Sequence, residues 1–474
     1  MPNRREFIKN TAIVSSMAWL PKPVWGRSKA EFTSLRPDIQ QRKFRSVAVD
    51  NYIEVVKKGI ADPEMRWLFE NCYPNTLDTT VDFEYLDGQP DTFVITGDID
   101  AMWLRDSSAQ VTPYLPLAKE DKHLREMIAG VINRQVHFIH LDPYANAFYK
   151  DTSKVSEWKE SDITKMLPGV HERKWEIDSL CYPIRLSYLY WKATGDTSPF
   201  DLRWQDAIIL ILKTFREQQR KTDRGPYTFQ RRTAWATDGV PLSGYGYPVK
   251  PVGLICSMFR PSDDATIFPF LIPSNYFAVE ILRYAAEMSK TILKNEGLAH
   301  NCWLLAEEVS DALKQYSTTM HPAHGRIIGY ETNAMGSYNL MDDANSPNLL
   351  SLPYLTDMEL INPDYCRTRA FVLSDDNPFY FKGLAGEGLG GPHTGINTIW
   401  PMGIIMRALT SSDPQEISKC LQMLKTTHGG TGFMHESFNK DNAADFTRKW
   451  FAWANTLFGE LVIKVYNHWP ELLK

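Results

Sequence analysis

The sequence is poor in the features that mark membrane, redox and nucleic-acid proteins. No apolar run among its 474 residues reaches the length of about 20 that a transmembrane helix needs. The six cysteines are scattered singly, without a C-x-x-C pair, which excludes the usual zinc-ribbon and thioredoxin signatures. The formal net charge of −5 shows no basic excess and argues against a nucleic-acid partner.

Metal-ligand patterns are also missing. The eleven histidines are dispersed, and His435-Glu436 is not part of an H-E-x-x-H motif. We therefore expect no metal and no cofactor. No Gly/Ser linker, charge block or short-period repeat divides the chain. One domain over residues 31–474 is the preferred interpretation, with a two-domain alternative broken near Asp223–Gly225.

The N-terminus resembles a signal peptide of the twin-arginine type. Arg4 and Arg5 precede a short apolar run, Thr11–Leu20, and Ser28-x-Ala30 is a suitable small-residue cleavage site. Residues 1–30 are thus predicted to be a leader, and the protein is expected in the periplasm or otherwise exported. A disordered basic tail is the alternative.

Aromatic residues make up 12% of the chain, and several of its 14 tryptophans lie beside Asp, Glu or Arg. Flat rings pack against sugar faces while neighbouring charged groups bind sugar hydroxyls. A neutral, polyhydroxylated ligand fits this composition better than a nucleic acid.

Apolar residues at helical spacing predict a mainly helical chain. The connections alternate between short polar ones and long ones rich in Gly, Pro and aromatics, such as Ala236–Asp264. This alternation predicts an all-α fold, a toroid of helical hairpins with small β-hairpins in its loops. A short strand is expected over Asp91–Asp98. The expected helices are Arg42–Lys58, Pro63–Cys72, Asp106–Tyr114, Lys122–Leu141, Ile177–Ala193, Trp204–Gln219, Ile267–Leu293, Leu298–Tyr316, Tyr365–Leu373, Thr398–Leu409, Ser412–Thr427 and Phe451–Tyr466.

The segment Thr96–Gln110, T-G-D-I-D-A-M-W-L-R-D-S-S-A-Q, crowds charged side chains at a predicted helix start. The positive end of the helix dipole favours carboxylates, but capping needs one acid and this segment has three. We therefore expect a binding role for its polar and aromatic residues, which are Asp98, Asp100, Trp103, Arg105 and Asp106.

The segment Lys174–Arg185, K-W-E-I-D-S-L-C-Y-P-I-R, places Trp175, Glu176 and Asp178 ahead of an apolar helix. Capping by Asp178 explains much of this pattern, so capping and ligand binding stay equally open.

The segment Met258–Ala265, M-F-R-P-S-D-D-A, brings Arg260 close to adjacent Asp263 and Asp264 before another helix. Neighbouring carboxylates repel, so one of them can be driven toward the protonated state of a general acid. Spacing does not tell the two aspartates apart, and Asp263 is the preferred candidate.

The loop Gly386–Thr394, G-E-G-L-G-G-P-H-T, combines four glycines with Glu387 and His393. Glycine lets backbone approach a ligand closely, and a histidine can donate to a hydroxyl. Ligand binding is preferred over a structural role.

Glu436 follows a glycine-rich turn and precedes the tryptophan-rich segment of Gly432–Asn455. A charged group beside aromatic rings is costly to bury, so we expect Glu436 to face a cleft, remain solvated and stay ionised. An ordinary surface glutamate that caps the next helix is the alternative.

Taken together, TGDIDAMWLRDSSAQ, WEIDSLCYPIRL, FRPSDDA, GPHT and MHESFNKD with FTRKWFAWANTLFGEL closely resemble glycoside hydrolase family 125, the bacterial and fungal exo-α-1,6-mannosidases. The resemblance runs from about Arg42 to the end of the chain. It implies an (α/α)6 barrel and metal-independent hydrolysis with inversion, with Glu436 as general base and Asp263 or Asp264 as general acid.

The resemblance also implies that Arg105, Asp106 and His393 line the subsite for a terminal mannose. The full set of expected substrate-binding residues is Asp100, Trp103, Arg105, Asp106, Glu176, Asp178, Arg260, Glu387 and His393. The expected partner is a mannose-containing glycan.

Other classes remain as alternatives. A non-catalytic glycan-binding protein could keep the toroid and the tryptophans, but both carboxylate sets are present. A glucoamylase-like hydrolase or a polysaccharide lyase on the same toroid is the nearer rival. The rich acid complement disfavours a lyase, which needs positive charge against an acidic sugar.

Overall fold

The computed structural model describes residues 32–474. Contacts divide the chain at Thr33, and Ser34–Lys474 forms one compact unit, within which the segment Asp223–Gly225 lies. The leader predicted for residues 1–30 lies outside the described residues. In the described part of the chain, no helix is both long and apolar enough to span a membrane.

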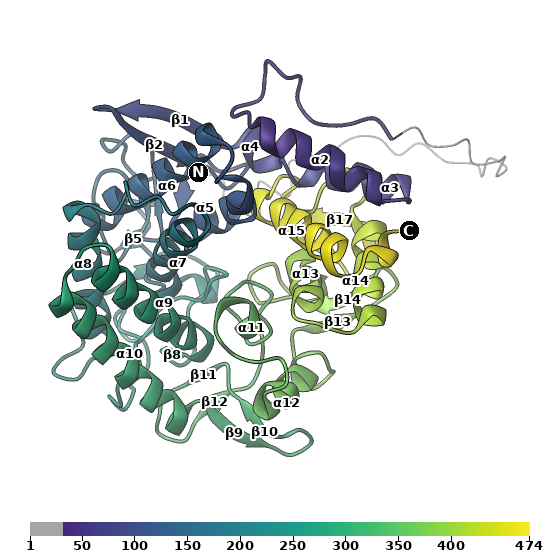
Figure 1. The fold of residues 1–474 in the computed structure, drawn as a ribbon. Helices are drawn as coiled ribbons and strands as arrows, with labels where there is room; N and C mark the ends of the chain where they lie inside the picture. The colour runs from purple at the N-terminus through teal and green to yellow at the C-terminus, as the bar shows by residue number, and fades with distance from the viewer. Residues whose placement is uncertain (1–31) are drawn as a thin grey trace. The chain divides into compact units, whose positions relative to one another are not determined.

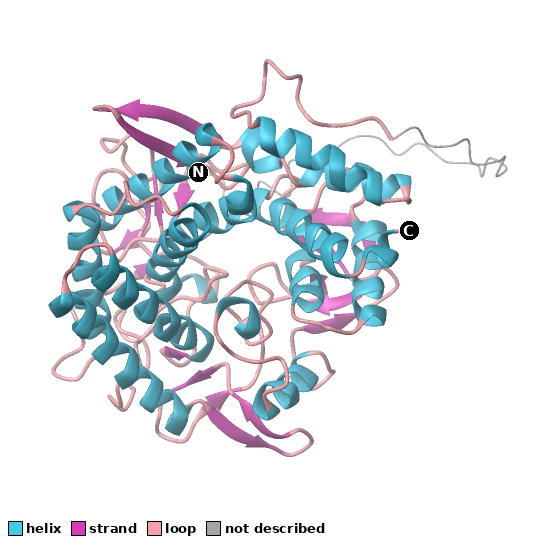
Figure 2. Cartoon of the chain, viewed as in Figure 1, coloured by secondary structure: helices cyan, strands magenta, loops and turns pink. Residues whose placement is uncertain are grey.

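Helices dominate Ser34–Lys474, as Figure 2 shows. The α-helices are α2 (Val47–Gly59), α3 (Pro63–Cys72), α4 (Asn75–Thr79), α5 (Leu104–Val111), α6 (Lys122–Leu141), α7 (Ile177–Thr194), α8 (Leu202–Gln218), α9 (Ile272–Thr291), α10 (Glu296–Tyr316), α11 (Leu352–Leu355), α12 (Pro363–Val372), α13 (Pro401–Leu409), α14 (Pro414–Thr427) and α15 (Ala452–His468). Short 3-10 helices are η1 (Thr112–Leu117), η2 (Ala236–Asp238) and η3 (Pro470–Leu473).

Within this unit the helices form two layers. Figure 1 shows α5, α7, α9, α11, α13 and α15 grouped around a common centre, with α6, α8, α10, α12 and α14 on their outer side. Neighbouring inner helices pack together in the sequence α5 with α7, α7 with α9, α13 with α15, and α15 with α5. The chain therefore alternates between the layers, and its last helix closes onto its first inner one.

Local signals explain where many helices begin and end. Asp121 caps α6 by accepting the Leu124 amide at 3.0 Å, and Asp201 caps α8 in the same way. Helix α7 ends at Thr194 and is capped by Gly195. The φ of Gly195, 72°, is left-handed and suits a residue without Cβ. Nearly all of the first three turns of α7 are buried, because an inner helix is covered on all sides.

The strands are short and lie in small antiparallel sheets. The two-stranded sheets pair β1 (Val81–Leu86) with β2 (Gln89–Val94), β9 (Thr318–His321) with β10 (Gly325–Ile328), β13 (Tyr380–Lys382) with β14 (Glu387–Leu389), and β5 (Asp162–Ile163) with β7 (Gln230–Arg231). The three-stranded sheets have the orders β3 (Met102–Trp103), β4 (Ala147–Phe148), β6 (Val170–Glu172); β12 (Tyr338–Asn339), β11 (Glu331–Thr332), β8 (Phe270–Leu271); and β15 (Thr398–Ile399), β16 (Ser437–Asn439), β17 (Asn442–Thr447).

The three-stranded sheets position the starts of the inner helices. Strand β3 leads directly into α5, β8 into α9, and β15 is followed closely by α13. Each of these strands pairs with strands from other parts of the chain. The loops at the inner-helix starts, which carry the charged sequence motifs, are therefore held by long-range pairing.

The helix expected from Arg42 begins at Val47, after the Ser46 cap. Two other predicted helix starts are too early for a common reason. The helix expected from Ile267 begins at Ile272, because Phe270–Leu271 pairs with β11. The helix expected from Thr398 begins at Pro401, because Thr398–Ile399 pairs with β16. The strand expected over Asp91–Asp98 ends at Val94, inside the β1–β2 hairpin. Strand pairing overrides local preference at these positions.

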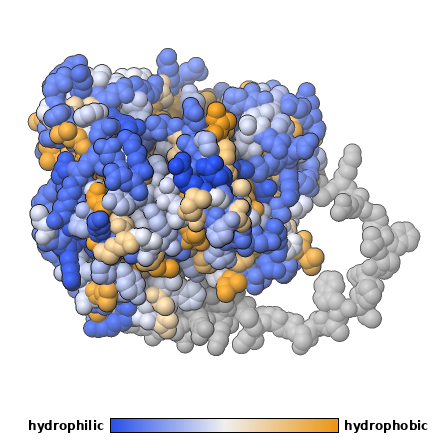
Figure 3. Space-filling view, turned by 90° about the horizontal axis from the view of Figure 1, so that it is seen from below, coloured by the Kyte–Doolittle hydropathy of each residue, from blue (hydrophilic) through white to orange (hydrophobic). Residues whose placement is uncertain are grey.

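The six cysteines all lie in the described residues and are free thiols, five buried and Cys366 exposed. Figure 3 shows one face of the molecule as mostly hydrophilic, with small scattered hydrophobic patches. Scattered single apolar side chains are normal for a protein surface, so this face offers no extended apolar surface for a partner.

Candidate active site

Arg105 is the centre of a buried charge cluster. It lies in the first turn of α5, which begins directly after Trp103 of β3. Its Nη1 is 2.6 Å from Glu176 Oε2 and 3.0 Å from Asp178 Oδ2, and its Nη2 is 3.9 Å from Asp263 Oδ1. Three sequence motifs that lie far apart in the chain thus meet at one guanidinium.

Arg105 carries one positive charge and lies beside the three buried carboxyl groups of Glu176, Asp178 and Asp106. Burial raises the pKa of Glu176 well above its usual range, and the Arg105 charge offsets this only in part. Burial also raises the pKa of Asp178 and brings the pKa of Asp106, 3.5 Å from Arg105 Nε, to about 6. One cation cannot neutralise three buried carboxylates, so the cluster holds protons above the pH range where carboxyls normally lose them.

The side chains of Asp263 and Asp264 contact different partners. Asp263 Oδ1 accepts from the Asn146 side chain at 3.3 Å and faces Arg105, and its side chain is 22% exposed. Asp264 is buried, and its Oδ1 accepts from the Thr237 hydroxyl at 2.6 Å. The structure therefore separates two aspartates that spacing alone leaves equivalent.

The pKa of Asp264 bears on which of the two aspartates could hold a proton. Burial raises this pKa, but the His393 ring, with Nδ1 3.9 Å from Asp264 Oδ1, and the Thr237 hydroxyl outweigh burial and leave it below its usual value. Of the two aspartates, Asp264 is therefore not the one that repulsion drives toward the protonated state, and the preference for Asp263 as general acid stays a prediction. Hydrogen bonding to the ionised form decides the direction.

The backbone of Asp263 is held in an uncommon conformation. Its φ of 67° is left-handed, which costs energy for a residue with a Cβ. Lys174 Nζ donates to the Asp263 main-chain oxygen and to Asp238, each at 2.8 Å, and the Ala265 amide donates to Thr237 O at 2.7 Å. The segment around η2 and a buried lysine thus hold the two aspartates from one side.

Glu436 is buried, which corrects the expectation of a solvated turn. The residue is 6% exposed and immediately precedes β16. Its Oε2 accepts from the Thr447 hydroxyl at 2.9 Å, and its Oε1 is 3.4 Å from Arg448 Nη1. Pairing of β16 with β17 brings these two partners to Glu436, so a counter-charge replaces the expected solvent.

Arg448 links Glu436 to the Arg105 cluster. Its Nη2 is 2.6 Å from Asp98 Oδ1, and its charge acts on Asp106, whose pKa it lowers against burial. A chain of alternating charges therefore runs from Glu436 through Arg448, Asp106 and Arg105 to Asp263. Arg105 and Asp106 lie in the first turn of α5, and Asp263 lies in the loop before β8. Glu436 immediately precedes β16, and Arg448 lies between β17 and α15.

Some predicted binding residues lie outside this network. The Asp100 side chain is 84% exposed and pairs only loosely with Lys154, at 3.4 Å. Glu387 on β14 pairs with Arg407 at 3.0 Å and Lys419 at 2.5 Å. Burial would raise the pKa of Glu387, but these two cations bring it to about 2. Glu387 thus belongs to a separate ion-pair cluster, because its strand turns it toward α13 and α14.

Two further predicted residues support the network without joining it. Arg260 is buried, pairs with Glu331 at 2.7 Å, and its amide donates to Asp264 O at 2.7 Å. Trp103 is buried and packs edge-on against His171, with ring centroids 5.2 Å apart. Both side chains shape the walls around the charged groups.

Sequence reasoning missed several members of the site. Asp343 is buried, accepts from Ser262 at 2.7 Å, and burial raises its pKa to about 6. A Cβ at Gly391 would lie 3.1 Å from Asp343 Oδ2, so the glycine of the GGPHT loop makes room for this carboxyl. Lys174 and Arg448 lie inside the segments Lys174–Arg185 and Gly432–Asn455. A basic residue within a segment that also carries acidic and aromatic side chains is the signal that could have found them.

A family model described as metal-independent alpha-mannosidase (GH125) matches residues 62–463 of this chain. The chain belongs to glycoside hydrolase family 125. The meiotically up-regulated gene 157 protein of Schizosaccharomyces pombe is 41% identical over 456 residues, which cover 93% of this chain and 89% of that relative.

Solved structures agree with family 125 membership. A Streptococcus pneumoniae metal-independent alpha-mannosidase, solved as a non-productive complex with alpha-1,6-mannobiose, is 39% identical, with a TM-score of 0.86 over 90% of this chain and 100% of that one. A Saccharomycopsis fibuligera glucoamylase at 11% identity has a TM-score of 0.51 over 90% of this chain and 97% of that one, which shows likeness of fold alone. Membership supports a glycoside hydrolase with α-mannosidase activity.

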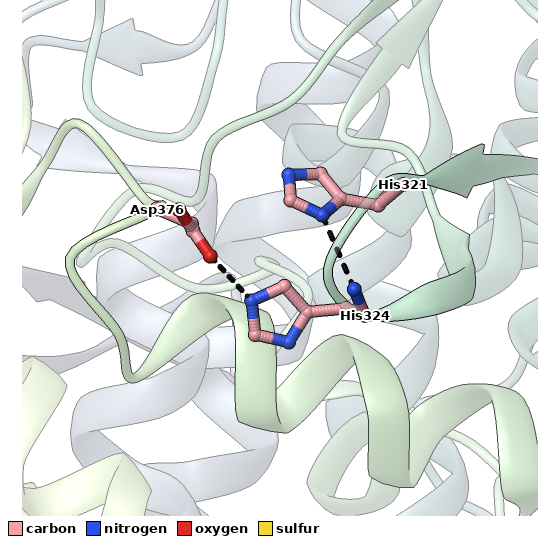
Figure 4. Close-up of side chains that lie close together, drawn as sticks. All are labelled: His321, His324 and Asp376. Atoms are coloured by element: carbon pink, nitrogen blue, oxygen red, sulfur yellow. Dashed lines mark hydrogen bonds and ion pairs between the residues drawn. The ribbon is translucent and has the colours of Figure 1, made fainter.

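The carboxylates of the family 125 network described above face arginine, hydroxyl or amide donors. In residues 32–474, the group of side chains whose spacing could hold a metal ion lies elsewhere, at His321, His324 and Asp376 (Figure 4). The donors and carboxyls of the charge network are groups that can bind sugar hydroxyls and transfer protons.

Proposed function

We propose that this family 125 protein is an exo-acting α-1,6-mannosidase that inverts anomeric configuration and folds as an (α/α)6 barrel. The two helix layers and the closure of α15 onto α5 support the barrel. The α-1,6-mannobiose bound by the Streptococcus pneumoniae relative supports the linkage. The natural substrate class is the terminal mannose of N-glycans or mannan-type oligosaccharides.

The observation that carries the proposal is the charge chain from Glu436 to Asp263. It presents two carboxyl groups from distant segments, each facing its own arginine, and the charges of both arginines act on Asp106. Inverting glycosidases need two such groups, about 6.5–9.5 Å apart, to leave room for a water beside the sugar. We expect this separation between Glu436 and Asp263 in the substrate complex.

Glu436 is proposed as the general base. The adjacent Arg448 supplies a counter-charge to the buried carboxylate, and the Thr447 hydroxyl fixes one carboxylate oxygen. The Glu436 carboxylate takes a proton from water as that water attacks the anomeric carbon of mannose. The bond from that carbon to the leaving oxygen breaks in the same step.

Asp263 is proposed as the general acid, with Asp264 as the alternative. A general acid must reach the leaving oxygen and must carry a proton. Asp263 is the more exposed of the two aspartates. It also lies beside Glu176, whose raised pKa keeps a proton in the cluster, whereas the low pKa of Asp264 fits a structural carboxylate.

Substrate binding is assigned to Arg105, Asp106 and His393 for the terminal mannose. The segment around η2, which contacts Asp263–Ala265, is proposed to close one end of the binding site. A closed end permits removal of single terminal residues and excludes chain interiors. Early release of long oligosaccharides from a mannan would contradict the exo mode.

The decisive experiment uses a panel of α-linked mannobioses. Release of mannose should be fastest from the 1,6-linked disaccharide, and proton NMR should detect β-mannose as the first anomer formed. Equal rates on all linkages would refute the linkage assignment, and α-mannose as the first product would refute inversion.

Export is proposed from the Arg4-Arg5 leader and its short apolar run. Cell fractionation tests it, with the processed protein expected outside the cytoplasm. A matched Arg4→Lys, Arg5→Lys double variant should accumulate unprocessed in the cytosol. Recovery of uncleaved wild-type protein in the cytosol alone would contradict export.

A further inference from the structure

A cluster of metal-ligand side chains lies away from the charge network. His321 ends β9 and His324 lies in the turn before β10, while Asp376 lies in the segment that follows α12 (Figure 4). One potential ligand atom from each residue lies within 4.8 Å of the other two. His324 and His321 are partly buried, and Asp376 is exposed.

The spacing of these atoms is close to what a tetrahedral ion requires. Zinc bonds of about 2.0–2.1 Å at the tetrahedral angle place ligand atoms about 3.4 Å apart. His324 Nε2 and Asp376 Oδ2 are 2.7 Å apart, so these two atoms would move slightly apart on binding. The most widely separated pair of ligand atoms, at most 4.8 Å apart, would move closer together. Movements of this size are within reach of side chains on a hairpin turn and a surface loop.

The imidazole rings are already oriented by the fold. His321 Nδ1 accepts the amides of Ala323 at 3.2 Å and His324 at 3.3 Å. Both rings pack against Phe371 of α12, with ring centroids 5.3 and 5.7 Å away. Preorganised ligands lose little freedom on binding, which favours a defined site over chance capture.

We propose that His321, His324 and Asp376 form a binding site for one divalent transition metal of the zinc type, completed by water. Two imidazoles and one carboxylate suit zinc, copper or nickel, whereas calcium and magnesium prefer oxygen ligands. Binding displaces the proton between His324 and Asp376 and replaces that hydrogen bond with two metal bonds.

The metal would fasten the β9–β10 hairpin to the segment after α12. Within residues 32–474, the three ligands make no hydrogen bond or ion pair with Arg105, Glu436 or Asp263. The site therefore acts on stability and leaves hydrolysis metal-independent. Ligands that bind only the folded state raise its stability by mass action.

The test is calorimetric titration of zinc into chelator-treated, dialysed full-length protein. Wild-type protein should bind one equivalent, and zinc should raise its thermal midpoint. His324→Asn and Asp376→Asn should each lose this equivalent and the thermal shift. The matched control is His300→Asn, because His300 is exposed on α10 and stacks on Trp303 away from the cluster.

The outcomes separate this site from chance binding and from the catalytic proposal. The proposed site would be wrong if both cluster variants bound zinc as the wild type does. It would also be wrong if the wild type bound calcium as tightly as zinc. Lack of a titratable equivalent in the wild type would overturn it as well. Mannosidase rates should be equal with and without zinc, so failure here leaves the proposed function intact.

Discussion

Lys174 Nζ donates a 2.8 Å hydrogen bond to the main-chain oxygen of Asp263, the residue whose backbone is left-handed. Lys174 is 2% exposed and also bonds Asp238, so it joins the proposed acid to the segment around η2. Because Asp263 is the proposed general acid, we expect this buried ammonium to act on the reaction through Asp263. Lys174 is thus proposed as a positioning residue.

Replacing Lys174 by Met should lower kcat by about 10–100-fold, because a small misplacement of a reacting group is costly. KM should change less than kcat, since Lys174 is not expected to touch the sugar. Steady-state kinetics on an α-1,6 disaccharide measure both constants.

The control for this substitution is Lys154→Met, a surface lysine that pairs with Asp100. It should retain near-normal kcat. An activated aryl mannoside, which needs little protonation, should recover much of the rate of Lys174→Met. Equal losses on both substrates would show that Lys174 acts on folding and not on the acid.

Separate amide substitutions of Glu436, Asp263 and Asp264 should distinguish the roles of these three carboxyl groups. Glu436→Gln should abolish turnover on every substrate while mannoside binding persists, because shape and most hydrogen bonds remain. Asp263→Asn should stop hydrolysis of the disaccharide but spare the activated aryl mannoside. General acid and base groups each contribute typically about 10²–10⁴-fold.

Asp264→Asn is the matched comparison. It should reduce both rates to a similar extent, since Asp264 supports the site through Thr237 and His393. Leaving-group dependence in Asp264→Asn instead of Asp263→Asn would reverse the acid assignment. Near-normal activity of Glu436→Gln would refute Glu436 as base.

Arg448→Met should lower kcat, because it removes the cation 3.4 Å from Glu436 and leaves a buried carboxylate without its counter-charge. Arg448→Lys should lower kcat less, because it keeps the charge. Steady-state kinetics on the α-1,6 disaccharide and on the activated aryl mannoside measure the change. Near-normal kcat in Arg448→Met would contradict the role given to this arginine.

Asp106→Asn should change how stability depends on pH. The folded pKa of Asp106, about 6, lies above its ordinary value of 3.8, because burial outweighs the Arg105 charge. The folded state therefore binds this proton more tightly than the unfolded state. The resulting stability is fully present below about pH 4 and is lost as pH rises toward 6.

The Asn variant lacks this titration, so its stability should fall less between pH 4 and pH 7 than that of the wild type. The shift corresponds to about 3 kcal/mol at most. Chemical unfolding at several pH values measures the difference. Parallel curves for the two proteins would show that Asp106 does not carry the raised pKa.

Family membership and much of the helix pattern could be predicted from the sequence. The ranges expected for α3 and α6 coincide with those found, because their caps and apolar spacing are local signals. The errors at the starts of α9 and α13 arose where strands from distant segments pair. No local propensity records such a partner.

The site residues divide in the same way. Arg105, Glu176, Asp263 and Glu436 could be named because they lie in short segments that combine several charged groups with aromatic residues or glycines. Glu387 could be misassigned for the same reason, since only the fold turns it toward Arg407 and Lys419. Lys174 and Asp343 were missed because their importance comes from contacts with the Asp263–Asp264 segment.

By itself, the sequence determined which segments are helical and which carry charged motifs, because hydrophobic period, capping and glycine content act over a few residues. Tertiary structure decided which carboxyl meets which cation and how deeply each is buried. It placed Arg105 beside Glu176 and Arg448 beside Glu436. Desolvation and neighbouring charge set the proton affinity of a carboxyl, and both depend on groups that the chain brings together only when it folds.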